Sequence, residues 1–181
     1  MAKTIQPIQG TGIDLRQIEE NDLALVMEWR NRPDIKECFF NRTTLTIDGQ
    51  LKWYEKYLQD ASDIMLMILT KEQEPIGTMA LYNIDPINLK AEYGRALIAS
   101  SAYRGKGYAK EALDLLLQYA FGALKLNRVQ LEVFNDNSAA IKLYERCGFV
   151  KEGVQREAFY DGFKYRDVLM MSILKNEYKY C

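Results

Sequence analysis

Histidine is absent from the 181 residues of this chain. Its absence excludes a Ser-His-Asp triad, a Cys-His dyad and any histidine-ligated zinc or haem site. An enzyme with this sequence must therefore move protons with carboxylates, tyrosine, lysine, cysteine or water. We expect no metal ion at its site.

Cysteines are few, and long apolar runs are lacking. Cys38, Cys147 and Cys181 are widely spaced and form no C-x-x-C pair, which is typical of free thiols in a reducing cytoplasm. Without histidine to activate it, a catalytic cysteine is disfavoured. The longest apolar run, 64–69, is far shorter than the roughly 20 residues of a membrane helix, and the chain begins with no apolar signal segment. We expect a cytoplasmic protein without a membrane partner.

A strong excess of either charge is lacking too. The chain has 24 Lys and Arg against 25 Asp and Glu, for a net charge of -1. This balance argues against a general nucleic-acid binder, which needs a basic face. Hydrophobic residues make up 48% and charged residues 27%, as in ordinary globular proteins. Repeats and linker-like stretches are not found, so we predict a single domain over residues 1–181.

Hydrophobic periodicity predicts alternating strands and helices. We expect strands at 13–18, 64–70, 76–83, 91–99, 129–133, 149–158 and 165–174. We expect a first helix over 21–30, stopped by Pro33. A second should follow a cap at Thr46 or Asp48, with Leu51, Tyr54 and Leu58 on one face. Two more are expected over 107–124 and from Asn137 to Gly148. Some strands follow as hairpins and others after helical crossovers, so the sheet should be mixed.

The segment 103–109 joins a predicted strand to the most strongly amphipathic helix. Glycines let a backbone turn tightly and approach a ligand closely, and the first amides of a helix attract anions. Arg104 and Lys106 would add positive charge, so the loop indicates a phosphate cradle. A glycine-rich turn with solvated charges explains the loop equally well. It is not a P-loop, because Gly107 follows Lys106 where Ser or Thr is needed, and a dinucleotide fingerprint wants a small residue where Lys110 stands.

The segment 135–149 contains a second group of polar residues. Asn137 can cap a helix that carries Tyr144 about two turns along its apolar face. Taken alone, these residues are best explained as a helix cap and a core tyrosine.

Together the two segments resemble the GNAT superfamily of acetyl-CoA-dependent N-acetyltransferases. The first signature of that family falls on Arg104, Gly107 and Ala109, and the second on Asn137, Ala140, Leu143, Tyr144, Gly148 and Phe149. The strong match covers residues 92–149. The ending, with Glu152, Gly153, Arg156, Gly162, Tyr165 and Asp167, looks like the RimJ/RimL-like branch of ribosomal-protein and spermidine acetyltransferases.

The resemblance implies a fold and a cofactor. The fold would be α/β (α+β), with a mixed, mostly antiparallel sheet of about seven strands, helices on both faces, and a splayed parallel pair at 91–99 and 128–134. Acetyl-CoA would bind with its pyrophosphate on the loop, contacting Arg104, Gly105, Lys106, Gly107, Tyr108 and Ala109. Backbone groups near Leu97 and Ile98 would hold the pantetheine arm and polarise the thioester carbonyl. Asn137 would contact the cofactor near its thioester.

The implied reaction is direct attack of a neutral amine on acetyl-CoA. A lysine-like amine arrives mostly as ammonium, with a pKa of about 10. Glu92 is the candidate base, acting directly or through water; the alternative is an ion pair between Glu92 and a nearby Arg or Lys. Tyr144 would protonate the departing thiolate, because tyrosine stays protonated at neutral pH.

The acceptor amine is less constrained. Residues 28–34 and 51–55 look like the acetyltransferase of pseudaminic acid synthesis, which implies a nucleotide-linked 4-amino sugar as the small-molecule acceptor. Arg30 would then pair with a phosphate, and Trp29 or Trp53 would stack on a base or sugar. The alternative places one tryptophan in the core and Arg30 in a surface ion pair.

Other acceptors and another class of protein stay open. A polyamine of the spermidine type would favour an acidic pocket, for which Glu28, Glu37 and Glu55 are available. A protein N-terminus is a third acceptor, and a non-catalytic acyl-CoA sensor is the alternative of another class. A homodimer could form through strand 168–174 and the tail 178–180.

Overall fold

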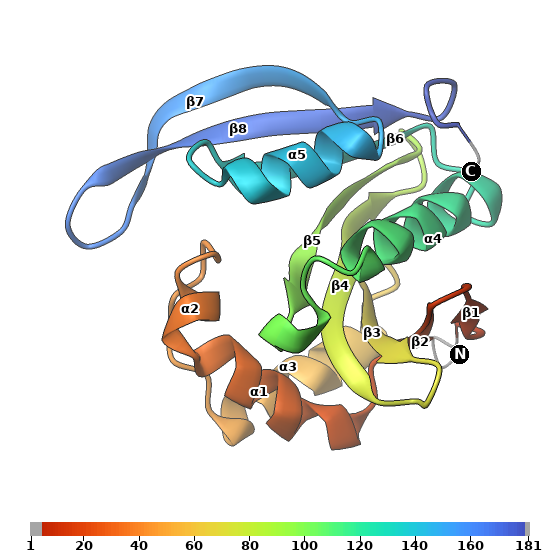
Figure 1. Cartoon of the computed structure of the whole chain (residues 1–181), viewed down its shortest axis with the longest axis vertical. Helices are drawn as coiled ribbons and strands as arrows, with labels where there is room; N and C mark the ends of the chain where they lie inside the picture. The colour runs from red at the N-terminus through yellow and green to blue at the C-terminus, as the bar shows by residue number, and fades with distance from the viewer. Residues whose placement is uncertain (1–4, 180–181) are drawn as a thin grey trace.

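The computed structural model describes residues 5–179 (Figure 1). The strands are β1 (Ile8–Gln9), β2 (Ile13–Gln17), β3 (Ile64–Thr70), β4 (Pro75–Asp85), β5 (Lys90–Ile98), β6 (Arg128–Phe134), β7 (Val150–Tyr160) and β8 (Tyr165–Leu174). The helices are α1 (Leu23–Asn31), α2 (Pro33–Lys36), α3 (Ile47–Gln59), α4 (Tyr108–Gly122) and α5 (Ser138–Arg146), with short 3-10 turns at Glu20–Asp22 and Ser101–Tyr103.

All eight strands form one sheet in the order β1-β2-β3-β4-β5-β6-β8-β7. Every neighbouring pair is antiparallel except β5 and β6. The predicted mixed, mostly antiparallel sheet is therefore confirmed. Its eighth strand, β1, has only two residues and shows no period in the sequence.

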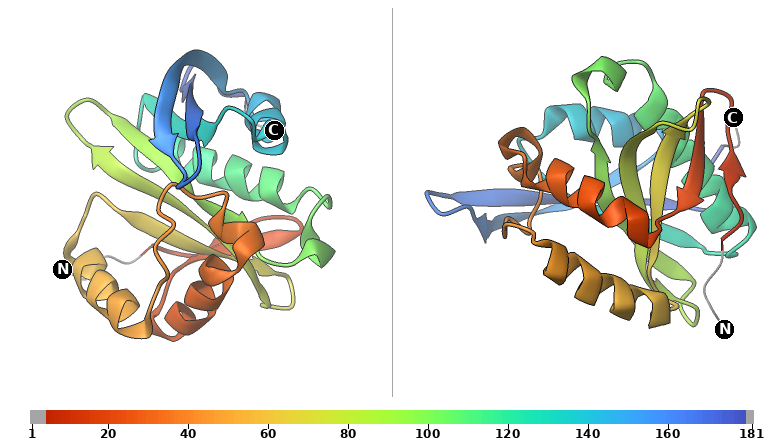
Figure 2. Two further views of the ribbon diagram at one scale, coloured as in Figure 1. Left: turned by 90° about the vertical axis from the view of Figure 1, so that its left-hand side faces the viewer. Right: turned by 90° about the horizontal axis from the view of Figure 1, so that it is seen from below.

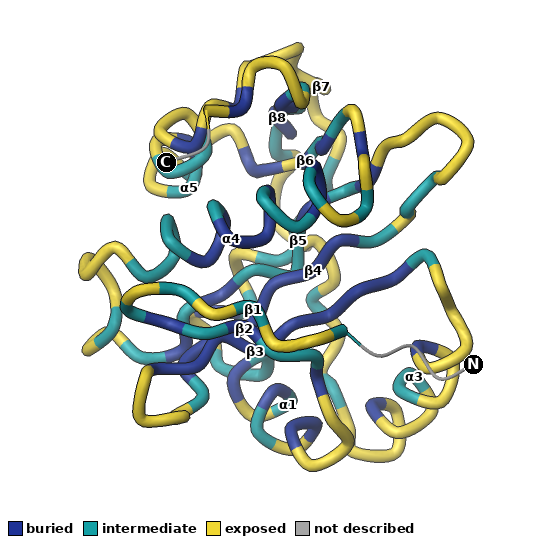
Figure 3. The backbone as a smooth tube through the Cα atoms, turned by 90° about the vertical axis from the view of Figure 1, so that its right-hand side faces the viewer, coloured by how far each residue is buried: buried dark blue, intermediate teal, exposed yellow. Residues whose placement is uncertain are grey.

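Helices cover both faces of the sheet (Figures 1 and 2). One core lies between the sheet and α4 and includes Leu113 and Leu116; the other includes Val26 of α1 and Tyr57 of α3. Figure 3 shows the buried residues concentrated in the central strands and α4, whereas β7 is exposed almost throughout. Within residues 5–179, no helix combines the length and the apolar character that crossing a bilayer requires.

The parallel pair splits in the middle of the sheet. Residues 90–92 of β5 pair with 128–130 of β6, and beyond them the two strands diverge. On its other side β5 has a bulge, since Leu97 opposes Thr78 while Gly94 opposes Ala80. Arg95 in this bulge has a φ of 50°, which is unusual for a residue with a side chain.

The ion pair of Arg95 and Asp63 stabilises the bulge. Nη1 of Arg95 donates to both carboxylate oxygens of Asp63, at 2.8 and 2.7 Å, and the Asp63 side chain is only 9% exposed. A charge-assisted contact to a buried carboxylate offsets backbone strain of order 1–3 kcal/mol. The bulge lies just beyond Glu92, where the pairing of β5 with β6 ends.

The expectation for the first helix holds, and that for the second needs correction. α1 ends at Asn31, before Pro33, and Pro33 then begins α2, a position where its missing N–H is not needed. Thr46 caps α3, its Oγ1 accepting from Gly49 N at 3.2 Å. Tyr54 packs against the core as expected, but the two leucines expected on the same face are turned outward. Leu51 and Leu58 are 37% and 43% exposed. The helix buries its aromatic side instead, because Tyr57 and the neighbouring rings cover more area.

The expected edge strand at 168–174 is also wrong. β8 lies between β6 and β7, so β7 is the edge of the sheet. Tyr178 packs inside the core, 5.4 Å from the Phe121 ring, and its hydroxyl donates to Asp114 O at 3.1 Å. Tyr180 lies outside the described residues. A homodimer stays a prediction, with β7 as the edge strand that such a contact would use.

Candidate active site

The glycine loop before α4 forms the first part of the site. Gly105 and Gly107 have φ values of 76° and 87°, a region that residues with a Cβ seldom adopt. Gly107 caps α4, so the first-turn amides of Tyr108 and Ala109 have no partner within the helix and can bind a ligand. Arg104 is held beside them: its Nε donates to Ile98 O at 3.2 Å, and its guanidinium lies 3.3 Å from an Asp34 oxygen.

A cavity of about 610 Å³, which we call the main cavity, opens against this loop. Its walls come from the loop, the start of α4, β5, α2 with the residues that follow it, and one side of α5. The expected cofactor-binding residues among its lining are Leu97, Ile98, Arg104, Gly105, Gly107, Tyr108, Ala109 and Asn137. The ammonium of Lys106 lies 5.5 Å from the centroid of the Tyr103 ring, at the outer end of the loop.

The open edge of β5 forms one wall of the main cavity. Ala99 N donates to Ile76 O at 2.8 Å, so the amide of Ala99 faces β4. Successive residues of a strand direct their amides to opposite edges, and the Ile98 N–H therefore faces the gap left by β6. Arg104 Nε reaches Ile98 O from that same side. Leu97 and Ile98 were both expected to hold the pantetheine arm, and Ile98 is the one whose amide faces a ligand.

A smaller cavity of about 140 Å³ lies at the split between β5 and β6. We call it the junction cavity, because it shares wall residues with its neighbours. It has Cys38, Phe39, Ala96, Asn137 and Ala140 in common with the main cavity. Tyr144 and Glu132 also line it.

Tyr144 projects from α5 into this region. Its ring stands edge-on to Tyr93, with centroids 5.8 Å apart, and 5.9 Å from Phe149. Burial, reinforced by the nearby Cys147 thiol, raises the pKa of Tyr144 to about 12. Its hydroxyl therefore stays protonated at neutral pH and can donate to an anion. Asn137 caps the same helix, its Oδ1 accepting from Ala140 N at 3.2 Å.

Two carboxylates lie on the sheet face opposite α4 and α5. Glu92 is the last β5 residue paired with β6, opposite Tyr82 on one side and Gln130 on the other. Burial raises the pKa of the Tyr82 hydroxyl, and the Glu92 carboxylate raises it further. Glu132 of β6 lines the junction cavity itself. Sequence reasoning missed it, because it reads as an ordinary polar residue between buried Leu131 and Val133.

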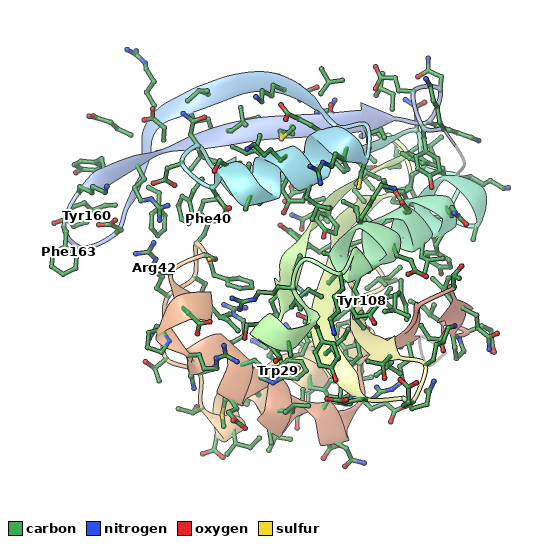
Figure 4. All side chains as sticks on the ribbon, viewed as in Figure 1. Trp29, Phe40, Arg42, Tyr108, Tyr160 and Phe163 are labelled. Carbon is green, nitrogen blue, oxygen red and sulfur yellow. The ribbon has the colours of Figure 1, made fainter. Side chains whose placement is uncertain are left out.

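A third cavity, of about 430 Å³, approaches the junction cavity from α1 and α3. We call it the aromatic cavity; Phe39, Phe40, Tyr82 and Arg95 line both. Among the expected substrate-binding residues, Arg30 and Trp53 line it. Trp29 is instead 8% exposed in the core of this layer, so its indole packs against other core side chains (Figure 4).

Arg30 is held in an unusual setting. Its guanidinium lies 3.6 Å from the Phe39 ring centroid and donates to Asn41 O at 3.1 Å. Burial, with the charge of Arg95, lowers the pKa of Arg30 to about 10. It still carries its charge at neutral pH, so it adds a cation to the aromatic cavity.

A fourth cavity, also about 430 Å³, lies on the side of the β7–β8 hairpin. We call it the charged cavity, since both signs of charge line it. The charged residues are Glu37, Arg42, Asp136, Asp161, Lys164 and Arg166. It meets the junction cavity at Cys38, Phe134 and Asn137. The junction cavity thus shares wall residues with three larger cavities.

The family is shown by the match of residues 13–150 to the acetyltransferase (GNAT) domain, and the chain belongs to this family. It is similar to spermidine N(1)-acetyltransferase of Vibrio cholerae serotype O1, with 31% identity over 166 residues, 92% of this chain and 95% of that protein. It is also similar to acetyltransferase PseH of Campylobacter jejuni, with 28% identity over 151 residues, 83% of this chain and 91% of the other.

A solved structure agrees with these relationships. The spermidine N-acetyltransferase from Vibrio cholerae, in complex with CoA and spermine, superposes with a TM-score of 0.88 at 30% identity, covering 93% of this chain and 99% of that one. The fold and enzyme class predicted from the sequence are confirmed. The protein is a GNAT N-acetyltransferase with acetyl-CoA as its co-substrate.

Proposed function

We propose that this enzyme transfers an acetyl group from acetyl-CoA to a primary amine by direct attack in the junction cavity. The observation that carries the proposal is the position of Tyr144, in a small cavity that shares walls with the main cavity and the aromatic cavity. A cofactor in the main cavity and an acceptor in the aromatic cavity would meet beside this hydroxyl. Proximity of that kind accounts for much of the rate of a two-substrate reaction.

Acetyl-CoA would lie along the main cavity. Its pyrophosphate would bind the first amides of α4, aided by Arg104. Its pantetheine arm would follow the free edge of β5, where the Ile98 amide can polarise the thioester carbonyl. Asn137, which lines both the main and the junction cavity, would contact the arm near the sulfur.

The proton steps use groups already in place. The amine nitrogen attacks the carbonyl carbon and the carbon–sulfur bond breaks. Glu92 would accept the amine proton, directly or through water, and Glu132, which lines the junction cavity, is a second candidate carboxylate. The departing thiolate receives a proton from Tyr144, which regains one from solvent or from the proton taken off the amine.

Similarity favours a polyamine as the acceptor. The relative with 31% identity is named a spermidine acetyltransferase, whereas PseH has 28% identity over a shorter region. We therefore rank spermidine above the nucleotide-linked amino sugar that residues 28–34 and 51–55 suggest. Glu132 in the junction cavity and Glu37 in the charged cavity would attract its ammonium groups.

An amine that carries an anion is the second candidate, and the aromatic cavity favours it. Its charged lining residues are Arg30 and Arg95, and Trp53 adds a flat surface for stacking. Glu28 and Glu55, available for an acidic pocket, are both exposed. A nucleotide-linked 4-amino sugar combines an anion with a ring system and would suit these groups.

One assay tests both candidates. The protein, acetyl-CoA and an amine are mixed, and free thiol is followed, with spermidine, a UDP-linked 4-amino sugar and an N-terminal peptide side by side. Faster release with spermidine supports the first candidate; faster release with the sugar, reduced by Arg30→Gln, supports the second. Thiol release with none of them, despite measurable CoA binding, would indicate an acyl-CoA sensor and contradict the proposal.

A further inference from the structure

The loop between α2 and α3, residues 37–46, separates the cavities of the site. It contributes Cys38 and Phe39 to the main cavity, and Cys38, Phe39 and Phe40 to the junction cavity. In the aromatic cavity it supplies four wall residues, and in the charged cavity three. A shift of this loop would change the route of an acceptor to Tyr144, so its position must be fixed by something.

Asn31, the last residue of α1, holds the loop by two reciprocal hydrogen bonds. Its Nδ2 donates to Leu45 O at 2.9 Å, and its Oδ1 accepts from Leu45 N at 2.8 Å, across 14 residues of sequence. The side-chain amide thus makes the two hydrogen bonds to Leu45 that a residue of a neighbouring β-strand would make. Only a group with one donor and one acceptor side by side can make this pair.

The other end of the loop reaches across the cleft. The Phe40 ring lies 4.6 Å from Phe134 and 5.7 Å from Phe159, and the Arg42 guanidinium is 5.2 Å from the Phe159 ring. Figure 4 shows Phe40 and Arg42 between α2 and the β7–β8 hairpin. The loop therefore spans from α1 to β6 and β7, with the Asn31 pair as its attachment on the α1 side.

We infer that Asn31 is a positioning residue for the acceptor, and that it acts by holding the α2–α3 loop in the form that walls the aromatic and junction cavities. This inference rests on the proposed acetyl transfer at the same site. An irregular loop loses conformational entropy when it is ordered, and the paired hydrogen bonds offset that loss. A carboxylate at position 31 would keep the acceptor for Leu45 N but would face Leu45 O with a second oxygen.

The test compares Asn31→Asp with Asn31→Ala and with the control Asn88→Asp. Asn88 donates from its side chain to Asp85 at 2.6 Å in the β4–β5 turn, so the control makes the same chemical change away from the cavities. For both Asn31 variants we expect the acceptor KM to rise about tenfold or more, the acetyl-CoA KM to stay unchanged, and residues 37–46 to exchange amide hydrogens faster. The control should match the wild type in all three measurements. The acceptor is spermidine or the UDP-linked amino sugar, whichever the wild type turns over faster.

Three results would overturn the inference. The first is an unchanged acceptor KM in both variants. The second is wild-type exchange in residues 37–46. The third is a lower kcat with both KM values unchanged and a lower melting temperature, which would show a general folding role. A wild type that acetylates no amine would instead contradict the proposed function, while the exchange measurement would still decide whether Asn31 holds the loop.

Discussion

At the scale of single residues, the site depends on where ordinary side chains are placed. Tyr144 is a core tyrosine by its packing against Tyr93 and Phe149, yet it also lines the junction cavity. Burial keeps its hydroxyl protonated far above neutral pH. The same side chain therefore fits both interpretations of the sequence, and the cavity shows how it can serve as a donor.

Tyr144→Phe tests this donor. We expect kcat to fall about 100-fold or more, as on loss of a general acid, with little change in the KM for acetyl-CoA. Because the pKa of Tyr144 is about 12, the wild-type rate should show no falling limb from this group between about pH 6 and pH 10. Steady-state rates over that pH range measure both effects. Turnover of Tyr144→Phe at the wild-type rate would show that another group protonates the thiolate.

Gly107→Ala tests the phosphate cradle. A Cβ at Gly107 would meet no atom within 4 Å, so its effect must come from the φ of 87°, which costs a residue with a Cβ about 1–2 kcal/mol. The chain would relieve this strain by turning the first amides of α4. We expect the acetyl-CoA KM to rise several-fold with kcat unchanged. Gly122→Ala is the control, since Gly122 also has open space and no positive φ; an unchanged KM in Gly107→Ala would argue against the cradle.

Sequence alone identified most of these residues, because short signatures carry them. The family resemblance indicates the loop 104–109, Asn137 and Tyr144, and all of these residues except Lys106 line the main or the junction cavity. The sequence does not indicate Glu132, because its place in the junction cavity depends on the split of β5 and β6 and not on the pattern of its own strand. Trp29 was expected to touch substrate, but α1 buries its ring. A sequence pattern does not show which of two tryptophans a helix turns inward.

At the scale of elements, the candidate site depends on the divergence of β5 and β6, which the junction cavity adjoins. Arg95 in the bulge is paired with Asp63, which lies 32 residues earlier, just before β3. The long helices, the hairpins and the buried strand β3 could be predicted, because their periods and turns are local. The bulge, the short β1 and the placing of β8 inside the sheet could not, because partners distant in sequence determine them.

Strands β6, β7 and β8 are joined by one polar network. Glu152 of β7 accepts two hydrogen bonds from the Arg128 guanidinium, both at 2.6 Å, and one from Ser172 at 2.7 Å. The hydrogen bonds from Arg128, with that from Ser172, lower the pKa of Glu152 to about 2. This carboxylate should therefore stabilise the hairpin at neutral pH.

Glu152→Gln is expected to lower stability at pH 7 and much less in acid. The pKa of Glu152 is lower in the folded state than its ordinary value of 4.5, so its contribution is present in full above that value. It is lost as the pH falls from there toward about 2. Urea midpoints of both proteins, measured from neutral to acidic pH, give the difference. Glu72→Gln, in the exposed turn before β4, is the control, and a difference of equal size at pH 7 and in acid would contradict this account.

At the scale of the whole molecule, the proposed function places the two substrates on different faces of the sheet until they meet at its split. The main cavity lies beside α4 and α5 and the aromatic cavity beside α1 and α3, and each shares wall residues with the junction cavity at the split in the sheet. Direct attack, as proposed, would need no histidine and no covalent intermediate. A near-neutral net charge is also enough to bind an anionic cofactor, because one glycine loop and a few cations can hold it locally.

The most direct test of this arrangement is whether the acetyl group passes straight from acetyl-CoA to the amine or is first bound to the protein. Cys38 lines the main, junction and charged cavities and is a nucleophile that could take the acetyl group first. The measurement is the initial rate over a matrix of acetyl-CoA and amine concentrations, with the intact mass of protein incubated with acetyl-CoA alone. Direct attack predicts intersecting double-reciprocal lines and an unchanged mass. Parallel lines, with one acetyl group added to the protein before the amine is present, would contradict it.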